Sequence, residues 1–202
     1  MNYKIKIAEL EKRIIDLSYK HKLSHIGSCL TALPIIYEIY SRKEKHERFV
    51  LSCGHAGLAL YVVLEDFFKV DAEKILIQCG VHPDMLKSFH IDCSTGSLGQ
   101  GLPIALGMAM ANRNEMVYCL ISDGEAMEGS IYEAMNVRAK YEVKNLKVYC
   151  NYNGWGAYDE SPMVNLSDIN VWDTSEHWFM KRYGQEAHYK VLTSHDYEKV
   201  FL

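Results

Sequence analysis

Two polar stretches each follow an apolar run, and both carry side chains that bind cations in proteins. In LISDGEAMEGSIYEAM (120–135), an apolar run ends with Ser122, Asp123 and Gly124. Asn153 lies thirty positions after Asp123 and follows a second apolar run. Mg2+ binds about six oxygen ligands and often takes one or two carboxylates together with substrate phosphates. One Asp, one Asn oxygen and a backbone carbonyl match that donor set if a diphosphate completes it. A pair of ordinary turns is the alternative interpretation, because Asp and Asn are common turn residues.

The surroundings of Asp123 would suit a diphosphate. Gly124 lets the backbone approach an anion closely, and a helix that begins near Glu128 or Gly129 would direct its N–H groups towards that anion. The segment STGSLGQGL (94–102) has three glycines and small hydroxyl side chains before an Ala- and Gly-rich stretch. It favours a backbone held against a flat ligand; a tight loop followed by close helix packing is the alternative.

Several histidines and two glutamates are further candidates for catalytic or binding residues. Four histidines lie among small residues at expected ends of elements and together favour a polar cleft that binds hydroxyl or phosphate groups: His25, His55, His82 and His195. The other five lack this setting, and we expect them to be surface or incidental residues: His21, His46, His90, His177 and His188. From the residues alone, Glu128 is a charge at a helix start and Glu133 a solvated side chain.

The elements that must position these residues alternate between helices and strands. Apolar spacing predicts helices over 5–20, 31–42, 54–68, 99–113, 128–143 and 173–184. Apolar runs predict strands over 48–53, 116–122, 145–153 and 189–194. This alternation predicts an α/β fold with a mainly parallel sheet covered by helices on both faces, where ligands bind beyond the carboxyl ends of strands. Residues 153–171 are expected to form a long functional loop.

The composition argues against nucleic-acid-binding, membrane, zinc-binding and secreted proteins. The 202 residues suit one domain over 1–202, and the net charge of -4 without a Lys/Arg-rich run points to neither nucleic acid nor membrane as a partner. The six cysteines form no CxxC pair, which makes a zinc knuckle or a thioredoxin-like motif very unlikely. No apolar stretch is long enough for a bilayer or resembles a signal peptide. A cytoplasmic protein with reduced cysteines is therefore expected.

Taken in order, these motifs resemble the diphosphate-binding half of transketolase, and most closely the N-terminal subunit of two-chain transketolases. The resemblance runs through HKLSHIGSCLTALPIIYEIY, ERFVLSCGHAGLALYVVL, STGSLGQGLPIALGMAMANR, SDGEAMEGSIYEAMNVRAKYEVKNLKVYCNYNG and SHDY, which is nearly the whole chain. It implies a thiamine-diphosphate-binding fold of the diphosphate type, shortened at its C-terminal end. It also implies thiamine diphosphate held through Mg2+, with Ca2+ or Mn2+ as substitutes.

The resemblance implies a role for each matched residue. The metal ligands would be Asp123, Asn153 and the backbone carbonyl of Trp155. The cofactor would contact His55, Gly96, Leu98, Asp123, Gly124, Glu125, Asn153 and His195. The substrate and its protons would be handled by His25, His55, His82 and His195. The dimer interface would include Glu128 and Glu133. Three residues depart from the family's usual pattern beside these positions: Ser122, Asn151 and Ser194.

The activity that the resemblance implies is transfer of a two-carbon ketol unit from a ketose to an aldose. In this family the glutamate that activates the cofactor lies on a pyrimidine-binding domain, which the motifs above do not include. We therefore expect a partner chain that supplies it, an α2β2 heterotetramer, and sugar or sugar-phosphate substrates. Two alternatives stay open. One is another thiamine-diphosphate activity, such as 2-oxoacid decarboxylation or carboligation, and the other is a non-catalytic remnant or regulatory module.

Overall fold

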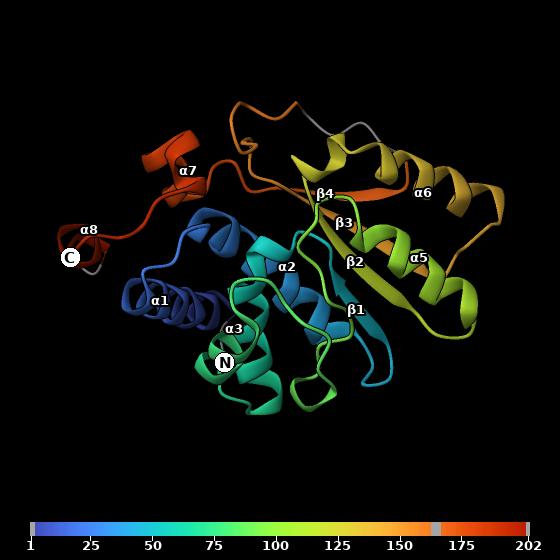
Figure 1. Cartoon of the computed structure of the whole chain (residues 1–202), viewed down its shortest axis with the longest axis horizontal. Helices are drawn as coiled ribbons and strands as arrows, with labels where there is room; N and C mark the ends of the chain where they lie inside the picture. The colour runs from blue at the N-terminus through green and yellow to red at the C-terminus, as the bar shows by residue number, and fades with distance from the viewer. Residues whose placement is uncertain (1–2, 163–166, 201–202) are drawn as a thin grey trace.

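The centre of the molecule is a parallel sheet of four strands, seen in the computed structural model, which describes residues 3–162 and 167–200 (Figure 1). The strands follow one another across the sheet in chain order: β1 (Arg48–Leu51), β2 (Val117–Ser122), β3 (Leu146–Tyr152) and β4 (Ile169–Asp173). Every residue of β2 is buried, as expected for a strand covered on both faces. The predicted α/β class with a parallel sheet is confirmed.

Helices cover the two faces of the sheet and enclose two apolar cores (Figure 1). One face is covered by α1 (Tyr3–His21), α2 (Ile26–Arg42), α3 (Gly57–Phe68) and α4 (Ala72–Cys79), and the other by α5 (Gly101–Ala111) and α6 (Gly129–Lys140). Because side chains alternate along a strand, Leu120 belongs to the first core and its neighbours Cys119 and Ile121 belong to the second.

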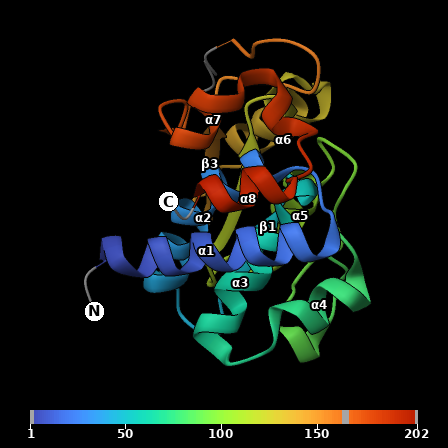
Figure 2. The same ribbon diagram turned by 90° about the vertical axis from the view of Figure 1, so that its left-hand side faces the viewer.

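The C-terminal region returns to the first face of the sheet. It contains α7 (Trp178–Tyr183), a 3-10 turn (Gly184–His188) and α8 (Ser194–Val200). Figure 2 shows α8 lying beside α1, where the rings of Tyr19 and Tyr197 stack with centroids 4.4 Å apart. The Tyr197 hydroxyl donates to Asp16 Oδ1 over 2.6 Å.

Two predictions about this region are wrong. The strand expected over 189–194 is not formed, because Leu192 is buried in the helical core and the segment pairs with no strand. The sheet is instead completed by β4, which begins inside the segment 153–171 that was expected to be a loop and ends at Asp173, the first residue of the helix expected over 173–184. Every residue of β4 is exposed or half-buried, so the segment lacks the apolar run that marks a buried strand. Residues 163–166 of that expected loop lie outside the described part of the chain.

The cysteines and the helices agree with two further expectations from the sequence. All six cysteines are free, and all but Cys79 are buried, as expected for small apolar side chains. None of the helices in the described ranges combines the length and the apolar character that crossing a bilayer requires.

Candidate active site

The site begins where β2 and β3 end side by side. The strand register pairs Ser122 with Asn151, so Asp123 and Asn153 follow at the same edge of the sheet. Asp123 Oδ2 accepts hydrogen bonds from the backbone N–H of Asn153 at 3.1 Å and of Gly154 at 2.8 Å. The Asn153 side-chain oxygen accepts from the N–H of Trp155 at 3.0 Å. The predicted pairing of one Asp and one Asn is therefore present in the structure.

The donor groups at this junction fit a hard divalent cation. Asp123 is only 1% exposed, burial raises its pKa to about 6 despite opposing backbone hydrogen bonds, and no ion pair among the described residues includes it. A nearby cation would offset this cost of burying a carboxylate. The described residues contain no group of three His, Cys, Asp or Glu side chains placed to hold a metal. One carboxylate, one amide oxygen and a backbone carbonyl suit Mg2+ when a diphosphate supplies further oxygens.

A cavity of about 200 Å³ opens beside this junction. It brings together most of the residues that the sequence singled out, and its lining comprises His25, Ser28, His55, His82, Gly96, Leu98, Ser122, Asp123, Gly124, Asn153, Trp155, Gly156, Ala157 and His188. Helix α6 begins at Gly129, as predicted, but Gly129 does not line the cavity. Gly124, which precedes the 3-10 turn Glu125–Met127, lines the cavity instead.

Three histidine rings form one wall of the cavity. The His25 ring lies 5.5 Å from that of His55 and 4.5 Å from that of His188, centroid to centroid. Burial and, to a smaller extent, the neighbouring histidines together lower the pKa of His25 to about 4 and that of His55 to about 3. Both imidazoles are therefore neutral at pH 7 and offer a nitrogen that accepts a proton or a hydrogen bond. The buried Nδ1 of His25 has no partner within the described residues.

His25 is held in an unusual backbone conformation by the C-terminal region. Its φ is 60°, in the left-handed region, and its N–H donates to the backbone carbonyl of His188 over 2.9 Å. Left-handed backbone is uncommon outside glycine and is maintained by surrounding structure. The 184–188 turn thus both holds His25 in place and supplies a third ring to the same wall.

His188 is the residue that sequence reasoning missed. The expectation that it is incidental is wrong, because it lines the cavity, whereas His195 lies exposed at the start of α8 and outside the lining. The residue that could have indicated the position of His188 is Gly27. A Cβ on residue 27 would lie 2.9 Å from the Cβ of Ala187, the neighbour of His188. Glycine at this position of α2 lets the turn that carries His188 approach the helix.

Glu125 supports the glycine-rich segment from behind the cavity. It is 0% exposed, and its Oε1 accepts from Ser52 Oγ at 2.5 Å and from the Gly99 N–H at 2.7 Å. It is not part of the cavity lining, and the cofactor contact expected for it stays a prediction. Its other oxygen, Oε2, has no partner among the described residues, and burial raises its pKa to about 7.

The remaining predicted residues lie nearer the surface. His82 is exposed but reaches the cavity, because a Cβ on Gly96 would lie 3.2 Å from its ring. Glu128 and Glu133 are exposed at the beginning of α6, beside the exposed side chains of Met127 and Tyr132. Their assignment to an interface stays a prediction.

Residues 12–192 match the model of the transketolase thiamine diphosphate binding domain. The chain therefore belongs to this family. It is 37% identical to human transketolase over 166 residues, 72% of this chain and 26% of that protein. It is 35% identical over 162 residues to one subunit of the apulose-4-phosphate transketolase of Phocaeicola vulgatus, 70% of this chain and 57% of that relative.

One further relative and one solved structure are also similar to this chain. The chain is 33% identical over 164 residues to the 6-deoxy-6-sulfo-D-fructose transketolase subunit SqwG of a Clostridium species, 71% of this chain and 60% of the relative. The solved transketolase of Leishmania mexicana shares the fold, with a TM-score of 0.69, 22% identity and coverage of 78% of this chain and 28% of that one. The chain spans less than two thirds of each of these proteins.

Proposed function

We propose that this chain is the diphosphate-binding subunit of a two-chain enzyme that transfers a two-carbon ketol unit from a ketose to an aldose. The observation that carries the proposal is the convergence, in one cavity, of the Asp123–Asn153 junction with the ring wall of His25, His55 and His188. Membership of the transketolase family and similarity to proteins named as transketolase subunits support it.

The roles of the residues follow from their positions. Asp123, Asn153 and the Trp155 carbonyl would hold Mg2+, and through it the diphosphate of thiamine diphosphate, with Gly124 close to the phosphate oxygens. Bound there, the cofactor would supply an acidic carbon for the chemistry at the sugar carbonyl. Gly96 and Leu98 would line its rings.

The neutral histidines would do the proton chemistry. Because burial keeps His25 and His55 unprotonated at pH 7, each can accept a proton from a sugar hydroxyl and return it. His188 and the exposed ring of His82 would complete the polar surface around the substrate. Neutral rings also avoid placing a cation beside a cofactor-bound Mg2+.

A partner chain would complete the site. In the proposed enzyme the partner carries the pyrimidine-binding domain with its activating glutamate, in an α2β2 assembly to which Glu128 and Glu133 contribute. The exposed apolar side chains of Met127 and Tyr132 beside these acids support a contact surface there. The six free cysteines support a cytoplasmic location for the complex.

The deciding experiment is affinity capture of this chain from its native cells, followed by assays of the purified complex. We expect a stoichiometric partner with a pyrimidine-binding domain, and ketol transfer that depends on thiamine diphosphate and Mg2+. Release of CO2 from 2-oxoacids without ketol transfer would instead identify a decarboxylase or carboligase. Recovery of the chain alone, inactive with added cofactor, would identify a non-catalytic module.

A further inference from the structure

A buried hydrogen-bond network joins the Asp123–Asn153 junction to α2, the helix that follows His25. Its centre is Asn151, near the end of β3, which is 2% exposed. The backbone carbonyl of Asn151 accepts from the Asp123 N–H at 3.1 Å, and its side-chain amide donates to Thr31 Oγ1 at 2.9 Å. Thr31 lies on α2 and is fully buried. One residue therefore contacts both the junction and the helix.

The direction of each bond around Asn151 is fixed by the groups that make it. Thr31 Oγ1 lies 2.8 Å from the Gly27 carbonyl oxygen, which can only accept, so the hydroxyl proton of Thr31 points to that oxygen. The amide nitrogen of Asn151 must then face Thr31, and its oxygen accepts from Thr174 Oγ1 at 2.7 Å. A carboxylate at position 151 would offer Thr31 no donor. The network therefore requires an amide at this position.

Two features of α2 connect Thr31 with the histidine wall, the rings of His25, His55 and His188. Gly27, whose carbonyl accepts from Thr31, is also the residue against which Ala187 packs. Ser28, the next residue, lines the cavity, and its carbonyl accepts from Thr31 Oγ1 at 3.3 Å. The turn that supplies His188 is therefore positioned by α2, and α2 is tied to the end of β3.

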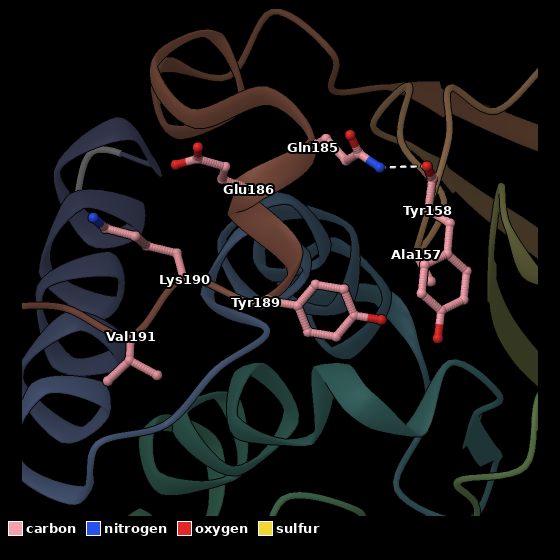
Figure 3. Close-up of a pocket in the computed structure, with 7 residues that line it drawn as sticks. All are labelled: Ala157, Tyr158, Gln185, Glu186, Tyr189, Lys190 and Val191. Atoms are coloured by element: carbon pink, nitrogen blue, oxygen red, sulfur yellow. Dashed lines mark hydrogen bonds between the residues drawn. The ribbon is translucent and has the colours of Figure 1, made fainter.

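A second link between the same parts of the molecule is exposed to solvent. Figure 3 shows the Gln185 amide donating to the backbone carbonyl of Tyr158, which joins the 184–188 turn to the loop that follows Asn153. Gln185 is exposed, and Tyr158 is 83% exposed. Water replaces an exposed hydrogen bond at little cost, whereas a buried polar group that loses its partner is penalised. We therefore expect the buried link through Asn151 to matter more for the shape of the cavity.

We propose that Asn151 is a positioning residue for the active site: through Thr31 it fixes the distance between the histidine wall and the Asp123–Asn153 junction. The wall and the junction line the same cavity, where bound thiamine diphosphate would contact both. Without the bond from Asn151 to Thr31, α2 can move away from the end of β3, and the cavity no longer matches the cofactor. The consequence for the cofactor rests on the proposed function, whereas the fixed distance does not.

The test uses the two-chain complex, reassembled with each variant of this chain. Calorimetry at fixed Mg2+ measures the dissociation constant of thiamine diphosphate, and steady-state ketol transfer measures kcat. Asn151→Ala and Thr31→Val should each raise the dissociation constant and lower kcat about tenfold, because the residues that contact the cofactor lose their support. The double variant should show no larger effect than either single variant, since both remove the same bond. Thr31→Ser keeps the hydroxyl and should stay within about twofold of the unmodified complex.

Asn145 provides a matched control, because it is a buried asparagine directly before the other end of β3. Its amide donates to three backbone carbonyls, so Asn145→Ala should lower stability towards urea without changing the dissociation constant of the cofactor. Gln185→Ala removes the exposed bond and should also leave that constant unchanged. Equal dissociation constants in Asn151→Ala and Asn145→Ala, or additive effects of Asn151→Ala and Thr31→Val, would overturn the inference.

The inference and the proposed function can fail separately. An unmodified complex that binds no thiamine diphosphate would count against the proposed function. Crystal structures of the unmodified and Thr31→Val complexes would then decide the role of Asn151. A displacement of His25 away from Asn153 by more than about 0.5 Å, the tolerance of a working site, supports the inference, and an unchanged distance overturns it.

Discussion

At the scale of a single residue, the burial of Asp123 favours the proposed metal site over an ordinary turn. A turn aspartate is normally exposed and bonds a nearby N–H, whereas Asp123 is buried and accepts from three backbone N–H groups. These bonds do not compensate for burial, since its pKa is still raised. The burial of this carboxylate supports the proposed cation at this position.

The corresponding prediction concerns Asp123→Asn in the captured complex. The variant keeps the size of the side chain and removes its charge, so Mg2+-dependent affinity for thiamine diphosphate should fall at least about a hundredfold, because losing even a group that only orients a metal ligand commonly costs about 10- to 100-fold. Equilibrium dialysis of the cofactor at fixed Mg2+ measures it. Asp159→Asn, an exposed aspartate in the following loop, serves as the control, and equal affinities in the two variants would refute the metal assignment.

His188 and His195 offer a second comparison between single residues. If the ring wall of the cavity handles the substrate, His188→Gln should lower kcat/KM about 10- to 100-fold, because one hydrogen-bonding ring of the site is lost. His195→Gln should leave kcat/KM within about twofold, since that ring is exposed outside the cavity. Steady-state kinetics at pH 6 and pH 8 would separate a proton-transfer role from a packing role. The reverse ranking would restore the role expected for His195.

The half-buried residues His25 and His55 also predict how stability depends on pH. The pKa values of His25 and His55 in the folded chain lie below the ordinary value of 6.5. The unfolded chain then binds more protons between about pH 4 and pH 6.5, so this contribution to stability is complete above pH 6.5 and is lost as the pH falls. Urea unfolding at pH 7 and pH 5 should show a loss smaller by about 1 kcal/mol in His55→Gln than in the unmodified protein. An equal loss in both would contradict the assignment of a neutral buried imidazole.

At the scale of elements, the glycine-rich segment is positioned by contact with β1 and by Glu125. Helix α5 begins at Gly101, where a Cβ would lie 2.6 Å from Ser52 Cα. Ser52 in turn donates to Glu125, which also accepts from the Gly99 N–H. The segment is therefore held by Ser52 and Glu125. Its small residues reflect this close packing as well as the proposed contact with a flat cofactor.

Two glycines of α5 provide the matched test of this packing. Gly101→Ala should lower the free energy of unfolding by about 1–3 kcal/mol, because the added methyl group meets backbone that cannot move freely. Gly107→Ala has open space around its Cβ and should be neutral or stabilise the helix by up to about 1 kcal/mol. Chemical denaturation of both variants measures the difference. Equal effects would show that the start of α5 has room to move away from β1.

Some helices and strands could be predicted from the local sequence pattern, and others could not. The strands β1, β2 and β3 are short apolar runs bounded by polar residues, and the helices that follow β1 and β2 have clear apolar spacing, so local pattern suffices. Strand β4 is recognisable only from its pairing with β3, since it has no buried residue of its own. Similarly, the position of His188 depends on the packing of Ala187 against Gly27, a contact between residues far apart in the chain that no local motif expresses.

At the scale of the whole molecule, the described residues form one half of a proposed site. The Asp123–Asn153 junction, the glycine-rich segment and the histidine wall meet in one cavity, while the activating glutamate of the proposed enzyme would belong to a partner chain. This division predicts that the chain alone binds Mg2+ and inorganic pyrophosphate, which calorimetry would measure, but that it transfers no ketol unit until its partner is added. Ketol transfer by the isolated chain would show that the partner is dispensable.

The bond from His25 N–H to the His188 carbonyl joins residues that are distant in sequence, and it has a consequence for synthesis of the protein on the ribosome. When residues up to Asn153 have emerged, the strands that carry the metal junction are available to pair. His25 cannot take its final conformation until residue 188 follows. The nascent chain would therefore gain affinity for a cation before it gains a wall for the sugar, and late-forming contacts of this kind slow folding because a long loop must close. This backbone hydrogen bond between His25 and His188 therefore implies an order in which the two parts of the site form.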